Sequence, residues 1–117
     1  MLGKYHVKTY LDTATRSSNH TGPDLRELFV YRLLEMIKVG PEVHFLPNTH
    51  HSLFALYIAT KDVLGFKRAL EARSIISGEC KLQLELLRRI LYLSDLHSAN
   101  YGLDGDKNLC IVDFRYL

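Results

Sequence analysis

The chain has 117 residues and a formal net charge of +2, and 47% of its residues are apolar. This length suits one domain, and the apolar fraction is enough for a packed core and excludes wholesale disorder. The balanced, scattered charge excludes a basic surface for nucleic acid or an anionic membrane. No apolar run approaches the ~20 residues of a membrane span, and the N-terminus has no signal-peptide pattern. We therefore expect a cytoplasmic protein.

The first half of the chain predicts a small sheet with one helix. Residues 4–10 alternate and are rich in Tyr, Val and Thr, which is typical of a short strand. Residues 24–38 carry apolar side chains at helical spacing and end before Gly40, a helix stop signal. Residues 42–47 and 52–63 indicate two more strands, of which the second is a nearly continuous apolar run, as in a central strand.

The second half predicts two helices and a hairpin. Residues 65–77 indicate a short helix, and residues 79–93 a longer one whose apolar side chains wrap most of its surface. Residues 101–103 and 109–112 indicate two strands around Asp104-Gly105, a strong hairpin signal. The order strand, helix, strand, strand, helix, helix, hairpin is an α+β pattern rather than an alternating βαβ one.

Three polar residues near the C-terminus suit a magnesium–phosphate site: Asp95, Asn100 and Asp113. Phosphoryl transfer from a nucleotide needs a lysine for the phosphates and an acid that positions it. It also needs a carboxylate and an amide for magnesium, and a carboxylate that orients the acceptor hydroxyl. Asp95 and Asn100 have the spacing of the protein-kinase catalytic loop, and Asp113-Phe114 follows an apolar strand, where the kinase D-F-G motif would lie.

These motifs resemble those of the protein-kinase-like superfamily. "DLHSAN" at 95–100 resembles the GDLHxxN loop of aminoglycoside-phosphotransferase-like and other small-molecule kinases, and "IVDFRYL" at 111–117 resembles their IDF segment. "YHVKTY" at 5–10 looks like the strand that bears the nucleotide lysine, here Lys8, and Glu27 looks like its ion-pair partner. The order of elements is also similar, so the resemblance spans essentially the whole chain.

The resemblance implies a kinase-like fold for residues 1–117. Residues 1–62 would form part of the small lobe, an antiparallel sheet with one helix, and residues 63–117 the first helices and the catalytic-loop hairpin of the large lobe. It also implies ATP and Mg²⁺ as cofactors and an unknown protein or small molecule as acceptor. The residues to which it gives a role are Lys8 (nucleotide phosphates), Glu27 (orienting Lys8), Asp95 (acceptor hydroxyl), Asn100 and Asp113 (magnesium), and the backbone around Ala59, Thr60 and Lys61 (adenine).

Departures from the family pattern support two alternatives. Leu93 replaces the catalytic-loop histidine, Arg115 replaces the D-F-G glycine and so favours a fixed segment, and no glycine-rich loop precedes Lys8. These features favour a pseudokinase or kinase-like scaffold without catalysis. The second alternative is an unrelated α+β interaction module, in which Glu27 belongs to a capping box and Asp113 ends a strand. Because a complete kinase-like domain is about twice this length, we expect a fragment that is inactive alone.

Overall fold

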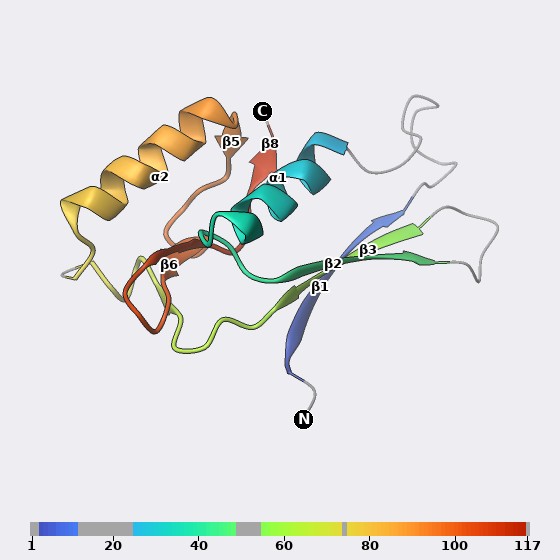
Figure 1. Cartoon of the computed structure of the whole chain (residues 1–117), viewed down its shortest axis with the longest axis horizontal. Coiled ribbons are helices and arrows are strands. Elements are labelled where there is room, and N and C mark those ends of the chain that lie inside the picture. The colour runs from blue at the N-terminus through green and yellow to red at the C-terminus, as the bar shows by residue number, and fades with distance from the viewer. Residues whose placement is uncertain (1–2, 12–24, 49–54, 74, 117) are drawn as a thin grey trace.

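The computed structural model describes residues 3–11, 25–48, 55–73 and 75–116 (Figure 1). Within these ranges the chain is an α+β domain, as predicted, with two helices, α1 (Leu25–Met36) and α2 (Gly78–Ile90). The strands form three sheets in which every pairing is antiparallel. Neither helix is long and apolar enough to cross a membrane.

The first sheet contains β1 (Tyr5–Leu11), β2 (Val43–Asn48) and β3 (Ala55–Lys61), in the order β1-β3-β2. The three predicted strands are confirmed, although residues 52–54 of the third lie outside the described residues. The central place of β3 explains its continuous apolar run, since a strand with neighbours on both sides is the most enclosed. Ile58 on this strand is almost fully buried.

Helix α1 packs on this sheet through one face (Figure 1). Its buried side chains are spaced three and four residues apart, as one helix face requires: Glu27, Val30, Tyr31 and Leu34. The helix predicted at 24–38 is confirmed over Leu25–Met36, with residue 24 outside the described residues. Lys38, two residues after the helix end, adopts a left-handed φ of 63°. The Val39 amide then donates to the Leu34 carbonyl at 2.8 Å and closes the last turn. A carboxylate and a tyrosine therefore face the interior beside apolar side chains.

Ser77 caps the N-terminus of helix α2, because its hydroxyl accepts the Cys80 amide at 3.1 Å. The inner side chains of α2 pack on the core at helical spacing: Cys80, Leu84, Leu87 and Leu91. The predicted helix at 79–93 is confirmed but ends three residues early. The expectation that it would be well buried is wrong, because none of its residues is buried and Leu82, Leu86 and Ile90 are exposed. Tyr92 adopts a φ of 54°, and the chain then enters β5 (Leu93–Ser94).

The predicted helix at 65–77 is wrong. Lys67–Arg68 form β4, which pairs with β6 (Tyr101–Leu103), and β6 pairs in turn with β7 (Leu109–Ile111). The residues after β4 form isolated turns, with Ala69 and Ala72 buried, so the apolar spacing marks buried turn positions. α2 is the only described helix after residue 63, where more than one was expected. The predicted hairpin of β6 and β7 is confirmed.

One core joins the two halves of the chain. It contains side chains of α1, β2 and β3 together with Leu93, Leu109, Ile111 and Phe114 from the second half. Ile111 also donates its amide to the Val39 carbonyl at 2.7 Å, which ties β7 to the turn after α1. β8 (Arg115–Tyr116) pairs with β5 and holds the chain after Phe114. The segment that carries Asp113 is therefore fixed on both sides.

The approach of β4 to β6 depends on Gly102, because a Cβ at this position would overlap the Lys67 carbonyl. We predict that Gly102→Ala lowers the free energy of unfolding by about 2 kcal/mol or more, which is about 8 °C in melting temperature for a domain of this size. Gly78→Ala is the matched control, since nothing lies within 4 Å of a Cβ there. Thermal unfolding checks both variants, and equal melting temperatures would contradict the prediction.

Candidate functional site

Lys8 and Glu27 form an ion pair between β1 and α1. The Lys8 Nζ lies 3.0 Å from the Glu27 Oε1. The Glu27 side chain is only 9% exposed, whereas that of Lys8 is 36% exposed. A buried carboxylate is strongly destabilising unless a cation or hydrogen-bond donor compensates it. Lys8 supplies that compensation, so the pair fixes the position of α1 relative to β1.

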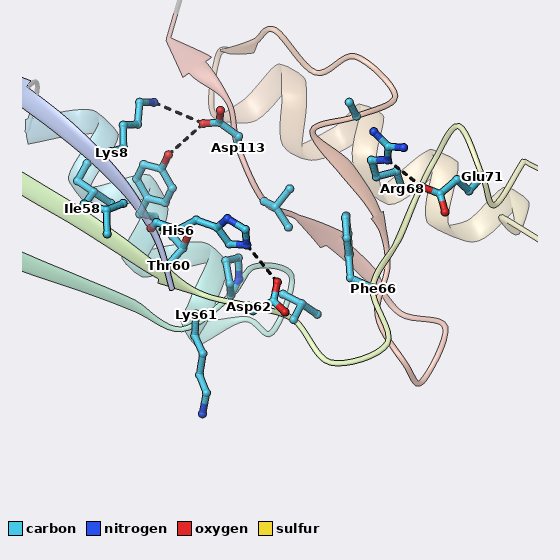
Figure 2. Close-up of a pocket in the computed structure, with 16 residues that line it drawn as sticks. His6, Lys8, Ile58, Thr60, Lys61, Asp62, Phe66, Arg68, Glu71 and Asp113 are labelled. Atoms are coloured by element: carbon cyan, nitrogen blue, oxygen red, sulfur yellow. Dashed lines mark hydrogen bonds and ion pairs between the residues drawn. The ribbon is translucent and has the colours of Figure 1, made fainter. Parts of the chain in front are cut away.

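Asp113 lies on the other side of the same lysine. The Lys8 Nζ is 3.4 Å from the Asp113 Oδ1, and the two side chains point toward each other in Figure 2. The Tyr31 hydroxyl donates to this Oδ1 at 3.2 Å, and the Phe114 amide donates to it at 2.9 Å. The structure thus brings Lys8, Glu27 and Asp113 together, although 105 residues separate Lys8 from Asp113.

Sequence reasoning did not assign Tyr31 to the site. The residue lies one helical turn after Glu27 on the same buried face of α1. An aromatic residue at such a position is normally a core residue, and the ring does pack in the core against Phe114. The sequence does show that Tyr31 follows Glu27 by one helical turn. This position places the Tyr31 hydroxyl on the same side of the helix as the Glu27 carboxylate.

Backbone contacts join the Asp95–Asn100 loop to the Asp113 segment. The Asn100 Nδ2 donates to the Asp95 carbonyl at 2.6 Å and spans the turn. The Asn100 carbonyl accepts the amides of Val112 at 2.9 Å and Asp113 at 3.2 Å. Asp95 adopts a φ of 57°, a left-handed conformation uncommon for a residue other than glycine. Asn100 and Asp113 therefore lie next to each other in space, as the sequence spacing led us to expect.

Two basic side chains flank the Asp95 carboxylate. The His97 Nε2 lies 3.6 Å from one oxygen, and the Arg115 Nε lies 3.6 Å from the other. His97 accepts the Ala99 amide through Nδ1 at 3.2 Å, so its neutral form carries the proton on Nε2, the nitrogen nearer Asp95. Both separations exceed hydrogen-bond length, and all three side chains are exposed. Solvent therefore weakens both pairs, and the Asp95 carboxylate stays accessible.

A cavity of about 650 Å³ lies between the first sheet and the second half of the chain (Figure 2). This volume falls within the usual range for small-molecule sites. Of the site residues expected from the sequence, the cavity lining includes Lys8, Thr60, Lys61 and Asp113 and does not include Glu27, Ala59, Asp95 and Asn100. Glu27 acts on the cavity through Lys8, and Asn100 borders it through Asp113.

Ala59, Thr60 and Lys61 lie inside the central strand β3, which is paired with both neighbouring strands. The Lys61 amide already donates to the Glu42 carbonyl at 2.9 Å, and its ammonium lies 3.7 Å from the Glu42 carboxylate. Figure 2 accordingly shows the Lys61 side chain pointing away from the cavity. The chain leaves the sheet at Asp62, and the next residue, Val63, also lines the cavity.

The donor set fits a magnesium ion that a phosphate-bearing ligand helps to hold. Among the described residues, no group of three or more His, Cys, Asp or Glu side chains could hold a metal alone. Magnesium, however, is commonly bound by one or two protein oxygens together with substrate phosphates. Asp113 offers a carboxylate 48% exposed, and the Asn100 amide oxygen accepts no hydrogen bond from the described residues. These two side chains fit such a partial site.

The described cysteines offer no nucleophile for this site. Cys110 is buried in β7, and this burial raises the pKa of its thiol to about 12. A thiol with so high a pKa carries almost no thiolate at neutral pH. Cys80 contacts the core from the first turn of α2 and does not line the cavity.

Comparison of the chain with protein-family models, with curated proteins and with solved structures gives no match.

We predict that Lys8 and Glu27 are energetically coupled. In a double-mutant cycle of Lys8→Met and Glu27→Gln, we expect a coupling free energy of about 1 kcal/mol or more, because Glu27 is buried. The matched control is Arg68→Met with Glu71→Gln, an ion pair at 2.8 Å with both side chains about half exposed. That control should give less than about 0.5 kcal/mol. Urea unfolding measures both cycles, and equal coupling in the two would show that Lys8 does not compensate a buried charge.

Proposed function

We propose that this chain is part of a kinase-like, ATP- and magnesium-dependent phosphotransferase domain. The observation that carries the proposal is the position of Lys8 at the cavity, between Glu27 and Asp113. A lysine between a helix carboxylate and a metal-ligand carboxylate is the arrangement that phosphoryl transfer in kinases needs. These three residues come from β1, α1 and the segment after β7, so local sequence does not account for their meeting.

The order and pairing of the elements support a kinase-like fold within this proposal. The small lobe would comprise residues 1–62, with the sheet β1-β3-β2 and α1, and the large lobe would begin at 63–117 with α2, the Asp95–Asn100 loop and the β6–β7 hairpin. The cavity would then be the nucleotide site between the lobes. A cytoplasmic location, where ATP and magnesium are abundant, belongs to the same proposal.

Each polar residue has one task in this proposal. Lys8 would neutralise the nucleotide phosphates, and Glu27 would hold its ammonium toward the cavity. Asn100 and Asp113 would hold the magnesium ion, which when bound neutralises charge on the phosphate oxygens. Asp95 would orient the acceptor hydroxyl, because its carboxylate lies outside the cavity lining but on the loop bonded to Asp113.

The adenine would meet the backbone just beyond the residues expected from the sequence. Ala59 and Thr60 are paired with both β1 and β2, and the Lys61 amide already donates to the Glu42 carbonyl. The Val63 carbonyl accepts the Phe66 amide at 3.2 Å, whereas the Val63 amide makes no hydrogen bond with another described backbone group. We therefore place the adenine edge at residues 62–63. Val63, Phe66 and Val112 supply the apolar lining that a flat base requires.

A kinase-like scaffold that binds nucleotide without catalysis is the second candidate function. The specific observation in its favour is Arg115, which lies 3.6 Å from the Asp95 carboxylate and is held in β8 by its pairing with Ser94. Its backbone φ is not positive, so the segment after Asp113 lacks the conformation that glycine would permit. In this candidate, Arg115 would keep Asp95 from the acceptor.

We predict that Mg-ATP raises the melting temperature of the protein and that ATP with EDTA does so less. At a ligand concentration about 100 times the dissociation constant, binding adds about 2.7 kcal/mol to stability, a shift of several degrees. Asp113→Asn should abolish the magnesium-dependent part of this shift. Asp106→Asn, at an exposed position of the β6–β7 turn, is the matched control and should keep it.

Turnover separates the candidate functions, and it is measured on a chain extended at both ends, because we expect this fragment to be inactive alone. If the protein binds Mg-ATP and hydrolyses or transfers its phosphate, and Asp95→Asn removes turnover but not binding, the phosphotransferase stands. Binding without turnover, unchanged by Asp95→Asn, would favour the scaffold. A melting temperature that ignores Mg-ATP would contradict both and leave the unrelated interaction module.

A further inference from the structure

The two oxygens of the Asp113 carboxylate have different surroundings. Oδ1 accepts three donors: the Phe114 amide at 2.9 Å, the Tyr31 hydroxyl at 3.2 Å and the Lys8 ammonium at 3.4 Å. Oδ2 accepts no hydrogen bond from any described residue. Because a carboxylate is planar, donors gathered on one oxygen fix the direction of the other.

Of the two side-chain donors, Tyr31 is the one held rigidly by packing. The residue is 4% exposed, and its ring lies 4.5 Å, centroid to centroid, from the ring of Phe114, the residue after Asp113. The Phe114 ring is completely buried, so neither ring can move without disturbing the core. Lys8, in contrast, is partly exposed and would turn toward phosphate in a nucleotide complex. Tyr31 would then remain on Oδ1 together with the Phe114 amide.

We propose that Tyr31 is a positioning residue for Asp113, which rests on the proposed function. Its hydroxyl holds Oδ1 and thereby directs Oδ2 to a divalent cation bound at the cavity. Side chains that donate hydrogen bonds to a metal-binding carboxylate restrict its orientation, and their loss typically weakens metal binding about 10- to 100-fold. Two residues on one buried face of α1 would then each orient a different residue of the site. Glu27 would set the lysine, and Tyr31, one turn later, would set the metal ligand.

The test is the affinity of the protein for Mn²⁺, a paramagnetic stand-in for Mg²⁺, measured by electron paramagnetic resonance with and without ATP. Tyr31→Phe keeps the ring and removes only the hydroxyl, so the contact with Phe114 remains. We expect about tenfold weaker Mn²⁺ binding, with the melting temperature of the metal-free protein changed by less than a few degrees. Asp113→Asn is the positive control and should weaken Mn²⁺ binding further.

The matched negative control is Tyr5→Phe. Tyr5 also packs through its ring, edge-on to His44 at 6.0 Å, and its hydroxyl makes no hydrogen bond with the described residues. Its Mn²⁺ affinity should equal that of the unmodified protein. A loss of Mn²⁺ affinity in Tyr5→Phe as large as that in Tyr31→Phe would overturn the inference.

Three further outcomes are informative. If Asp113→Asn weakens Mn²⁺ binding but Tyr31→Phe does not, the positioning role fails and the proposed function stands. If Tyr31→Phe weakens Mn²⁺ binding but Mn²⁺ does not promote ATP binding in the unmodified protein, the positioning role stands and the proposed function fails. If the unmodified protein binds no Mn²⁺ with or without ATP, both fail.

Discussion

The ammonium of Lys8, held between the carboxylates of Glu27 and Asp113, is the interaction on which the site depends. Two carboxylates close to one point repel each other, and the repulsion grows when one of them is buried. Lys8 removes this repulsion and attracts both groups, so it draws α1 and the segment after β7 toward β1. The three side chains differ in solvent exposure: Glu27 is enclosed, whereas Lys8 and Asp113 reach the cavity. A ligand can therefore replace Asp113 as a partner of the Lys8 ammonium, while the ion pair between Lys8 and Glu27 remains.

The apolar core holds the two carboxylates in place, because each lies next to a fully buried side chain along the chain or on the same helix face. Asp113 precedes Phe114, and Glu27 shares a helix face with Val30 and Leu34, and all three apolar side chains belong to one core cluster. The tilted contact between Tyr31 and Phe114 joins the two neighbourhoods directly. Because a closely packed interior does not deform continuously, the core restricts the positions of the polar side chains attached to it.

The sequence predicted the longer elements and missed the shortest ones, for a physical reason. Helix α1, helix α2 and the strands of the first sheet each repeat an apolar pattern often enough to be recognised. Strands β4, β5 and β8 have two residues each and are defined by partners far along the chain, as when Ser94 pairs with Arg115. For the same reason the sequence predicts a helix at 65–77, because the pairing of Arg68 with Gly102 has no signal in the local sequence.

The candidate site follows the same rule. The resemblance to kinase-like proteins implied the proximity of Lys8 to Glu27 and of Asn100 to Asp113. The part played by Tyr31 was not implied, because only the fold shows that its hydroxyl meets a carboxylate 82 residues away. The adenine contact expected around Ala59, Thr60 and Lys61 stays a prediction, and the structure adds only that Ala59 and Thr60 are paired with both neighbouring strands, which a sequence does not show.

The balance between a phosphotransferase and a silent scaffold turns on how firmly Arg115 holds Asp95. The Arg115 side chain is 78% exposed, that of Asp95 is 42% exposed, and their closest atoms are 3.6 Å apart. An ion pair of this kind contributes at most about 1 kcal/mol, because water competes for both partners. An acceptor hydroxyl that hydrogen-bonds to the carboxylate gains a comparable amount. Arg115 therefore does not lock Asp95, and an anionic group on an acceptor could engage the arginine as the hydroxyl takes its place. For this reason the contact between Arg115 and Asp95 does not by itself argue against the proposed phosphotransferase.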